Sequence, residues 1–450
     1  MKTGLDILLG TDSYKMGHSL MYPDDTTHII SYFESRGGMF SNGSRTFDDI
    51  VFFGLQYFLK EYLSARISLE DVWETAAFAE EHGVPFDDKM WLRVVQENYG
   101  RLPVRIRALP EGTIVKPGMP LFTVENTMPG AHGVVSYLET ELTHVWQPIT
   151  VASYSWALRQ TLRKYYDISG TEAETFDFRV HDFGGRGASS RESAMLGGMA
   201  HLAVGWRGTD TVVAIDGARS YYNEPMAGFS VPATEHSVMT AWGPDRELAA
   251  YTQMMSRFGK RGGIVSIVSD TYDVHNVVDN IMPQIRNTAE SYGATPVVRL
   301  DSGDAIRNVL LTLDSLSSSY GYTVNDKGYH VLNGVRILQG DGVNLHAVED
   351  ILDVMTRYQW SIDNIVFGIG GALLQKHDRD TFKFAFKACG VRDGQSPDTY
   401  RPIKKQPKHG GEWKTSKGID ELDTSKFVTV FNGSISHNND FSDIRERINS

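Results

Sequence analysis

Charged side chains of the kind that bind phosphorylated ligands follow several short, β-branched runs of this sequence. They occur in residues 181–187, 269–270, 301–304 and 339–342, and the glycine-rich segment 368–371 follows another such run. Arg186 and Arg299 carry planar guanidinium groups that suit phosphate oxygens. Asp270, Asp301 and Asp341 could bind ribose hydroxyls or a metal ion carried by a pyrophosphate. This combination predicts an anionic ligand with hydroxyl groups, and a phosphorylated sugar is the natural class.

Glycines in two of these clusters would allow backbone N–H groups to approach a ligand closely. They are Gly340, Gly342, Gly370 and Gly371. Where a helix follows, its N-terminus adds a positive field that suits phosphate. The simpler interpretation is that such glycines only form tight turns, just as Arg299 and Asp301 could be a structural ion pair. Their recurrence beside Arg and Asp favours ligand binding, whereas the pattern around His236 assigns that residue no role.

The elements that must position these residues begin near residue 171, where short β-branched runs alternate with helical segments. The predicted strands are residues 176–180, 211–215, 264–268, 297–300, 335–338 and 365–367. Such alternation is typical of a parallel sheet with helical crossovers. Six units favour an irregular (β/α) barrel, in which the loops after the strands gather at one end. This convergence would bring the distant clusters into one site.

The rest of the chain is predicted to form a second, mixed α/β domain. Helices are expected over residues 48–63, 70–83 and 143–166, and alternation punctuated by Pro and Gly predicts a small β region at 102–127. We therefore expect an N-terminal mixed α/β region at 1–170, an α/β-barrel catalytic domain at 171–385, and a C-terminal segment at 386–450 that packs with the N-terminal region.

The composition excludes several classes of protein. The 450 residues carry a formal net charge of −12, with 22% charged and 41% hydrophobic residues, which is typical of a soluble globular protein and makes nucleic acid an unexpected partner. The single cysteine, Cys389, cannot form an intramolecular disulfide, so a reducing cytoplasm is expected. No uncharged apolar run approaches the roughly 18 residues that span a bilayer, so no membrane association is expected.

The motifs taken together resemble those of the type II phosphoribosyltransferases, and among them the members that use nicotinamide. The matching segments are residues 10–15, 31–36, 181–187, 208–211, 230–237, 268–270, 299–303, 339–343 and 367–371. A match of this length and order is far more specific than any single glycine motif. The chain departs from the family pattern at Gly185 and Ile369, where no catalytic side chain is affected, and at Ala385, which replaces a phosphate-contacting serine.

The resemblance implies an activity, cofactors and partners. Nicotinamide and phosphoribosyl pyrophosphate would give nicotinamide mononucleotide and pyrophosphate with Mg²⁺, the committed step of NAD salvage. The enzyme would be a cytoplasmic homodimer with composite active sites. ATP would be a coupled co-substrate, hydrolysed through a phosphorylated histidine that maps to His236.

The resemblance also implies a role for each site residue. Phe183 and Tyr14 of the partner subunit would sandwich the pyridine ring, and Asp210 would accept a hydrogen bond from the carboxamide and repel nicotinate. The expected catalytic residues are His236, Asp301 and Arg299. The expected pyrophosphate contacts are Arg186, His236 and Arg299, the ribose contacts are Asp301, Gly340 and Asp341, and the metal contact is Asp270. The expected 5′-phosphate contacts are Gly370, Gly371, Arg379, Lys387 and Arg36, the last from the other subunit, and Ser266 completes the substrate-binding set.

Three alternatives remain open from the sequence. The chain could be a nicotinate phosphoribosyltransferase, although Asp210 argues against it. A barrel aldolase or isomerase acting on a phosphosugar could use the same strand ends, and a dimeric binding protein could retain the barrel without catalysis. The basic stretch at residues 401–408 resembles a mobile phosphate or ATP loop, and a solvated surface loop is its simpler interpretation.

Overall fold

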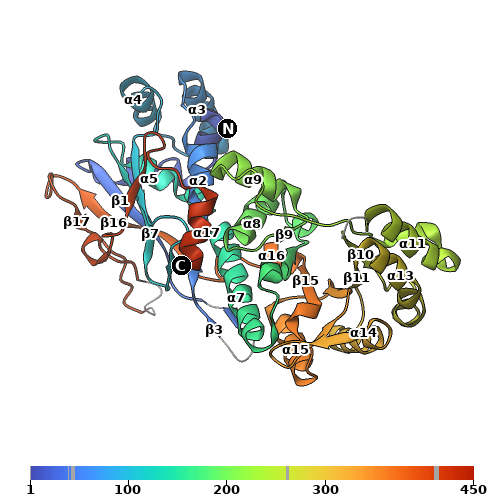
Figure 1. The fold of residues 1–450 in the computed structure, drawn as a ribbon. Coiled ribbons are helices and arrows are strands. Elements are labelled where there is room, and N and C mark those ends of the chain that lie inside the picture. The colour runs from blue at the N-terminus through green and yellow to red at the C-terminus, as the bar shows by residue number, and fades with distance from the viewer. Residues whose placement is uncertain (1, 39, 42–45, 260–262, 410–414) are drawn as a thin grey trace.

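Two six-stranded sheets organise the chain. The computed structural model describes residues 2–38, 40–41, 46–259, 263–409 and 415–450. One sheet combines strands from both ends of the chain, and the other is built from its middle. Figure 1 shows this division, because the blue and red segments lie together on one side and the green to orange segments form the other.

The sheet that joins the two chain ends is antiparallel throughout. In spatial order its strands are β17 (Arg401–Pro402), β16 (Phe384–Arg392), β1 (His28–Ser35), β7 (Pro120–Asn126), β5 (Val104–Ala108) and β18 (Val428–Asn432). In β5 the side chains alternate between buried and half-buried positions, as a strand requires. The β region predicted for residues 102–127 is therefore confirmed.

The second sheet is parallel and strongly curled. In spatial order its strands are β10 (Ile264–Val268), β11 (Thr295–Leu300), β14 (Arg336–Gln339), β15 (Ile365–Ile369), β8 (Val180–Asp182) and β9 (Gly208–Thr209). Between its two edges runs the segment 229–233, in which Phe229 bridges Gly208 and Ala233 bridges Ser266. Those single bridges bring the edge strands toward closure, which confirms the predicted irregular α/β barrel.

Two of the six predicted barrel strands were placed wrongly. The run at 176–180 starts with a 3₁₀ turn (Ala173–Phe178), and β8 begins only at Val180. The run at 211–215 opens helix α9 (Val212–Tyr222), and the strand is the short β9 just before it. Helix α9 buries one face against α8 (Arg191–Ala203), and this packing overrides the β-propensity of its first valines.

The helical expectations hold best where the sequence carries capping signals. Helix α3 (Leu69–His82) begins after a capping box at Ser68 and ends at Gly83, whose φ of +82° suits glycine. Helix α7 (Trp146–Ser169) covers most of the segment predicted at 143–166. The segment at 48–63 is more broken: it contains β4 (Ile50–Val51), α2 (Leu55–Phe58) and a π-helical turn (Leu59–Leu63).

The remaining elements complete the two halves. The other helices are α1 (Gly4–Leu9), α4 (Asp88–Asn98), α5 (Gly133–Tyr137), α6 (Glu139–Thr143), α10 (His236–Trp242), α11 (Glu247–Phe258), α12 (Val274–Asn276), α13 (Met282–Tyr292), α14 (Ala305–Tyr320), α15 (Leu345–Arg357), α16 (Gly371–Leu374) and α17 (Phe441–Asn449). The other strands are β2 (Phe40–Ser41), β3 (Thr46–Phe47), β6 (Ile114–Val115), β12 (Tyr322–Val324) and β13 (His330–Leu332). In the described chain, no helix has both the length and the apolar character needed to cross a membrane.

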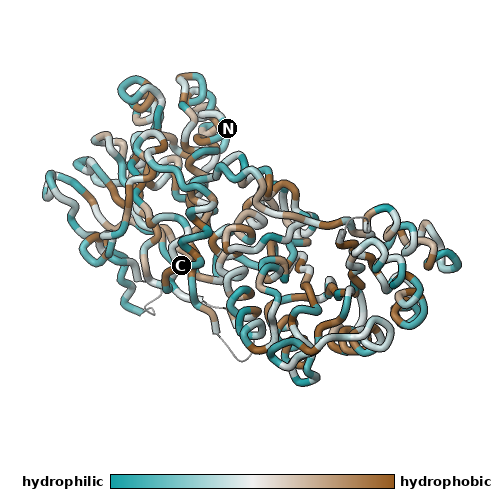
Figure 2. The backbone as a smooth tube through the Cα atoms, in the orientation of Figure 1, coloured by the Kyte–Doolittle hydropathy of each residue, from teal (hydrophilic) through white to brown (hydrophobic). Residues whose placement is uncertain are grey.

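One continuous hydrophobic core connects the two sheets. It runs from residues of β1 and β7 through α7 to the strands of the barrel. Figure 2 shows hydrophobic segments along the strands of both sheets and more hydrophilic ones on the outer helices. The division of the chain at residues 170 and 385 stays a prediction, and strand β16 contains the second of these boundaries.

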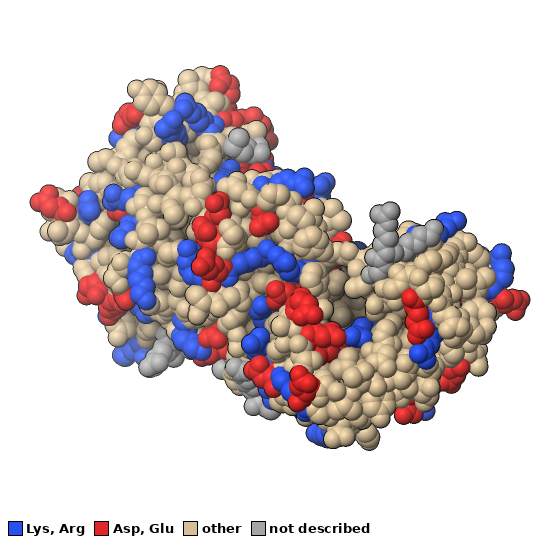
Figure 3. Space-filling model, viewed as in Figure 1, with Lys and Arg blue, Asp and Glu red and all other residues tan. Residues whose placement is uncertain are grey.

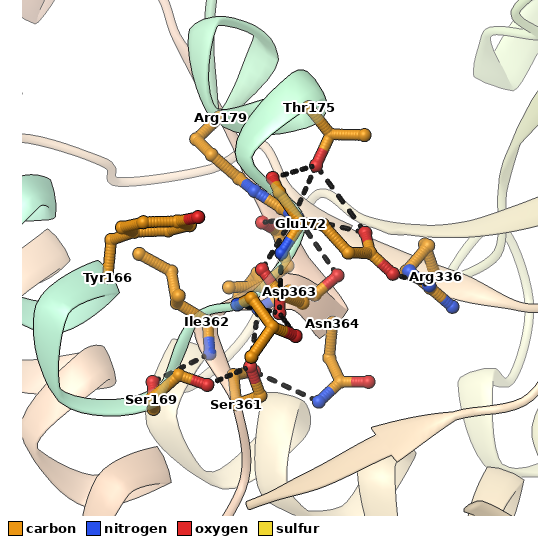
Figure 4. Close-up of polar contacts among 12 residues, drawn as sticks. Tyr166, Ser169, Glu172, Thr175, Arg179, Arg336, Ser361, Ile362, Asp363 and Asn364 are labelled. Carbon is orange, nitrogen blue, oxygen red and sulfur yellow. Dashed lines mark hydrogen bonds and ion pairs between the residues drawn. The ribbon is translucent and has the colours of Figure 1, made fainter. Parts of the chain in front are cut away.

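A buried ion network ties together the chain segments that enter the barrel strands (Figure 4). Arg179, just before β8, donates from Nη2 to Asp363 Oδ1 over 3.0 Å, and the two side chains are 3% and 0% exposed. Glu172 accepts from Arg179 at 3.4 Å and from Arg336 at 2.7 Å. Arg179 and Asp363 precede β8 and β15, and Arg336 is the first residue of β14. The network therefore lies at the opposite end of the sheet from the loops that follow the strands.

Candidate active site

A cation, two carboxylates and an imidazole lie together at one end of the barrel. Arg299 comes from β11, Asp270 and Asp301 from the loops after β10 and β11, and His236 from the start of α10. Arg299 donates from Nη2 to Asp301 Oδ2 over 2.6 Å and from Nη1 to the Thr234 carbonyl over 3.0 Å. His236 opens helix α10, and its Nε2 lies 3.9 Å from Asp301 Oδ2 and 4.0 Å from Asp270 Oδ1. The structure therefore brings these predicted residues into one neighbourhood.

Asp270 combines a structural contact with an open one. Its Oδ2 accepts the backbone N–H of Asp301 at 2.9 Å and the hydroxyl of Ser302. Its Oδ1 is buried and has no hydrogen-bond partner among the described residues, which is an arrangement that suits a cation. The described residues contain no group of three or more His, Cys, Asp or Glu side chains that could enclose a metal. Asp270 thus fits Mg²⁺ held mainly by a substrate's phosphates, as is usual for this ion.

The ring of Phe183 lies beside this cluster. The guanidinium carbon of Arg299 is 5.8 Å from the ring centroid, within the range of a cation–π contact. The ring packs on β15, where a Cβ at Gly368 would lie 2.2 Å from ring atom Cε2. Only glycine at residue 368 leaves space for the ring in this position. The half-buried ring thus has a fixed place at the same end of the barrel as Arg299.

Asp210 and the segment 230–234 connect the loop that carries Phe183 with the cluster around Arg299. The Asp210 N–H donates to the Asp182 carbonyl over 2.9 Å, and its exposed carboxylate accepts the hydroxyl of Ser230 at 2.5 Å. Four residues after Ser230, Thr234 accepts the hydrogen bond from Arg299. The chain from 230 to 234 therefore spans the distance between the two clusters.

The predicted glycines lie at the ends of β14 and β15. A Cβ at Gly340 would lie 2.2 Å from Asp301 Oδ1, so glycine is required for the carboxylate to occupy this place. Around Gly371 no atom lies within 4 Å of where a Cβ would be, and at Gly370 only the Phe183 carbonyl approaches, at 3.8 Å. Those backbone segments are open to a ligand. Arg186 and Asp341 are exposed on neighbouring loops.

Ser266 also carries an unused polar group. It lies on β10 with 2% of its surface exposed, and its hydroxyl has no hydrogen-bond partner among the described residues. Its backbone pairs with Ala233, in the segment between β9 and β10. The residue therefore offers a hydroxyl inside the curled sheet, next to the segment that leads from Asp210 to His236.

The remaining predicted phosphate contacts gather elsewhere, around a cavity of about 640 Å³ beside β16. The cationic residues that line it are Arg36, Arg379, Lys383, Lys387 and Lys405. Burial lowers the pKa of the Lys387 ammonium, and the positive charges of Arg36, Lys15 and Lys405 lower it further, against the opposing effect of Glu139. Such an accumulation of positive charge suits an anionic group.

Two further residues, Lys405 and Tyr14, lie at or near this cavity, and the sequence gave little indication of their positions. Lys405 belongs to the basic stretch at 401–408, for which the sequence left open a phosphate-binding loop or a solvated surface loop. In the structure Lys405 lines the cavity. Tyr14 is 59% exposed and lies next to Lys15, which pairs with the cavity residue Glu139 at 2.8 Å. Tyr14 is therefore on the side of the antiparallel sheet, whereas Phe183 is in the barrel. Within one chain these two rings belong to different clusters.

Acidic and basic side chains are interspersed over the face drawn in Figure 3. The surface is hollowed between the region of β15 and the lobe that carries α11 and α13, and charges of both signs lie at its rim. Because both signs occur, this face presents no continuous basic surface of the kind that follows a nucleic-acid backbone.

Comparison with known protein families gives two matches that together cover most of the chain. Residues 178–432 match the model of the nicotinate phosphoribosyltransferase family, and residues 6–106 match the nicotinamide phosphoribosyltransferase N-terminal domain. The first match spans the barrel and continues into the antiparallel sheet. The second covers the first strand of that sheet and the segment that contains Tyr14 and Arg36.

Individual relatives agree with these matches. A nicotinamide phosphoribosyltransferase of Xanthomonas campestris is 45% identical over 407 residues, which is 90% of this chain and 85% of the relative. One from Acinetobacter baylyi is 31% identical, covering 95% of this chain and 90% of the relative.

Solved structures support the fold at low identity. A nicotinate-nucleotide pyrophosphorylase from Pyrococcus furiosus has a TM-score of 0.60 at 16% identity, covering 100% of this chain and 96% of that one. Human nicotinic acid phosphoribosyltransferase has a TM-score of 0.57 at 17% identity, covering 98% and 92%. The predicted type II phosphoribosyltransferase fold is thus confirmed, and this chain belongs to the nicotinate phosphoribosyltransferase family and carries the N-terminal domain of its nicotinamide-using relatives.

Proposed function

We propose that this protein is a nicotinamide phosphoribosyltransferase, which joins nicotinamide to the phosphoribosyl group of phosphoribosyl pyrophosphate and releases pyrophosphate, as a step of NAD salvage. The observation that carries the proposal is the convergence of Arg299, Asp301 and His236 beside the ring of Phe183 at one end of the barrel. A flat base and a charged pentose have to meet in such a place. The relatives from Xanthomonas campestris and Acinetobacter baylyi, both named nicotinamide phosphoribosyltransferase, support the same reaction.

The base binds between Phe183 and the exposed Asp210. Phe183 offers a ring face fixed against Gly368, and Asp210 offers carboxylate oxygens to the carboxamide N–H₂ of nicotinamide. Nicotinate would bring a second negative charge against Asp210, and a site built around such a hydrogen bond rejects a mismatched ligand strongly. The proposal therefore specifies the amide as the substrate. Ser266 supplies a further hydroxyl from β10.

Transfer breaks the anomeric C–O bond and forms the C–N bond to the pyridine nitrogen. The ribosyl centre gains oxocarbenium character while pyrophosphate leaves, so the reaction needs positioning and charge stabilisation and no protein nucleophile. Arg299, Arg186 and His236 hold the leaving pyrophosphate. Asp301, together with Gly340 and Asp341, holds the ribose, and the Asp301 carboxylate favours positive charge on the sugar.

Mg²⁺ is part of the proposal, as the counter-ion of the pyrophosphate. Asp270 would hold it through Oδ1, the buried oxygen that lacks a partner among the described residues. When bound, the ion would neutralise charge on the leaving group. The protein's own contribution is to orient Asp270, which it does through the Asp301 N–H and the Ser302 hydroxyl.

A homodimer would complete each site. The cationic cavity beside β16 and the exposed Tyr14 lie on the antiparallel-sheet side of the chain, away from the barrel loops. In the proposed dimer, Tyr14 and Arg36 of the partner subunit face the barrel end of the first, so that Tyr14 covers the base opposite Phe183. Arg379, Lys387 and Lys405 line one cavity with Arg36 and therefore come from the same partner subunit. They hold the 5′-phosphate near the open glycines Gly370 and Gly371 of the first subunit.

ATP hydrolysis would be coupled through His236. Its Nδ1 lies 3.0 Å from the Thr271 hydroxyl, which leaves Nε2 toward Asp270 and Asp301. A neutral Nε2 would attack the γ-phosphorus of ATP, forming an N–P bond as the bond to ADP breaks. Water then cleaves the N–P bond, releasing phosphate. A cytoplasmic location belongs to the same proposal, because the proposed substrates dissolve in water and the single cysteine requires no oxidation.

Product analysis tests the proposed function. Purified protein is incubated with phosphoribosyl pyrophosphate and Mg²⁺, together with nicotinamide, nicotinate or no base, and the products are separated by chromatography. Nicotinamide mononucleotide and an equal amount of pyrophosphate are expected with nicotinamide alone. A faster reaction with nicotinate would identify the acid as the substrate. Consumption of a phosphosugar without a base would favour an aldolase or isomerase.

The coupling is tested separately with His236→Ala. This variant should lose ATP hydrolysis and the stimulation by ATP, while it retains some transfer in the absence of ATP. Unchanged ATP dependence would remove the phosphohistidine from the proposal and leave the transfer reaction in place.

A further inference from the structure

The geometry points to Asp182 as the residue that positions the nicotinamide subsite, and this inference rests on the proposed function. Asp182 is the last residue of β8, directly before Phe183, and none of its surface is exposed. It does not touch the proposed substrate. We propose that it sets the positions of Phe183 and Asp210 together, and thereby the affinity for the base and the preference for amide over acid.

The contacts of Asp182 tie two loops to one residue. Its Oδ1 accepts the backbone N–H of Gly184 at 2.7 Å, which fixes the chain on the far side of Phe183. Its Oδ2 accepts the hydroxyl of Thr209 at 3.3 Å, and its backbone carbonyl accepts the N–H of Asp210 at 2.9 Å. The side chain and main chain of one residue therefore hold the segments that carry both of the proposed base contacts.

Further contacts make this arrangement rigid. The Phe183 N–H donates to the Ile369 carbonyl over 2.9 Å, so the residue after Asp182 is fixed on β15 as well. Thr209 uses its hydroxyl twice, because Oγ1 also accepts the N–H of Thr211 at 3.0 Å. The start of α9 is thus connected to the same carboxylate through Thr209.

The neighbouring helix is shaped to accommodate the carboxylate. A Cβ at Gly198, in α8, would lie 3.1 Å from Asp182 Oδ2 and 2.5 Å from the Cβ of Ala214 in α9. Burial is the main cause that raises the pKa of Asp182, to about 6, with a smaller contribution from the negative charge of Asp210. At pH 8 the carboxylate is ionised and can accept both hydrogen bonds at once, which a neutral amide cannot.

Asp182→Asn is the first test, assayed at pH 8 with nicotinamide and phosphoribosyl pyrophosphate varied in turn. The amide keeps the size of the carboxylate, but its Nδ2 donates where the carboxylate oxygen accepts, so the contact to Gly184 or to Thr209 has to break or reverse. The KM for nicotinamide should rise about ten-fold, as expected for one lost hydrogen bond to a charged group, while the KM for phosphoribosyl pyrophosphate changes less than two-fold. The ratio of kcat/KM for nicotinamide over nicotinate should fall as Asp210 shifts.

Thr209 provides an independent pair of variants. Thr209→Val removes the hydroxyl and should raise the KM for nicotinamide in the same direction, whereas Thr209→Ser keeps it and should restore the wild-type value. This pair tests the inference even if Asp182→Asn does not fold.

Glu111→Gln is the matched control. Glu111 is 3% exposed and likewise accepts backbone N–H groups, from Gly54 and Gln56, but it lies outside the barrel loops. Its substitution should lower the melting temperature without changing either KM. The inference is overturned if Asp182→Asn or Thr209→Val lowers stability as Glu111→Gln does and leaves the KM for nicotinamide unchanged. If the wild type forms no mononucleotide, the proposed function fails first and this inference with it.

Discussion

The ring of Phe183 rests against the bare backbone of Gly368, so closely that a methyl group there would lie 2.2 Å from the ring atom Cε2. Neighbouring strands β8 and β15 therefore determine the place of this ring together. A glycine inside a strand costs conformational entropy, and here its benefit is a fixed aromatic surface.

Gly368→Ala should displace the ring and weaken the binding of nicotinamide. We expect the KM for nicotinamide to rise at least ten-fold and the protein to lose about 1–3 kcal/mol of unfolding free energy, as for other overpacked sites. Steady-state kinetics and urea unfolding measure both effects. In a Phe183→Ala background the same substitution should cost little stability, because the clashing ring is gone. An equal loss in both backgrounds would contradict the clash.

The proposed composite site predicts complementation between two inactive variants. Asp301→Ala removes a barrel-end carboxylate, and Arg379→Ala removes a cation from the cavity beside β16. If each site takes Asp301 from one subunit and Arg379 from the other, a mixed dimer contains one intact site. Refolding an equal mixture should restore roughly a quarter of wild-type activity, because half of the dimers are mixed and half of their sites are intact. Absence of recovery in proven mixed dimers would place both residues in the same subunit's site.

The ion pair between Arg179 and Asp363 predicts a large effect on stability. Replacing one partner of a buried pair leaves the other charge unpaired, so Asp363→Asn should lower the unfolding free energy by about 3–5 kcal/mol. The exposed pair between Arg286 and Glu290, 2.6 Å apart, provides the comparison, and Glu290→Gln should change stability by less than about 0.5 kcal/mol. Equal effects in urea unfolding would show that burial of the first pair does not matter.

His201 predicts a loss of stability in mild acid. The residue is fully buried, and burial lowers its pKa to about 3, against about 6.5 for an unfolded chain. As the pH falls, the unfolded chain therefore binds a proton at this histidine before the folded chain does. Protonation of His201 does not lower the free energy of unfolding above about pH 6.5, and lowers it progressively as the pH falls toward 3. The loss is about 1.4 kcal/mol per pH unit, or about 2 kcal/mol between pH 6.5 and 5.

Unfolding free energies measured from pH 5 to 7 check this contribution. In His201→Asn the dependence of the unfolding free energy on pH should become shallower by the share of one proton. An unchanged slope in His201→Asn would mean that another group titrates.

The barrel was predictable because its strands carry β-branched runs and the residues proposed to bind ligands lie at or directly after the ends of these strands. Since the ends of parallel strands converge, Asp270 and Arg299 could be placed together from the order of motifs alone. The strand expected at 211–215 was wrong because Thr, Val and Val have high β-propensity. The helix that forms there buries Ala214, Gly217, Ala218 and Tyr222, and this face packs on α8, which local sequence does not reveal.

The positions of Lys405 and Asp182 could not be read from the sequence for different reasons. Lys405 lies in a basic stretch whose pattern also suits a solvated loop, and its place on the cavity wall depends on how the chain returns past β16. Asp182 stands within a recognised motif, yet its side chain turns inward, and no spacing rule distinguishes a buried acid from a ligand-binding one. The only indication in the sequence was that Asp182 stands directly before Phe183, the ring proposed to stack on the base.

The segment from Ser230 to Thr234 limits the distance between two parts of the proposed site. One end is anchored to the carboxylate proposed to recognise the heterocycle, and the other supports the guanidinium proposed to grip the leaving group. Four residues reach at most about 14 Å, so the chain length itself limits how far apart the two halves of a bound substrate pair can be. Adding or removing a single residue here would change that distance and shift the bridge between Ala233 and Ser266, while the ladders among the six barrel strands would keep their register.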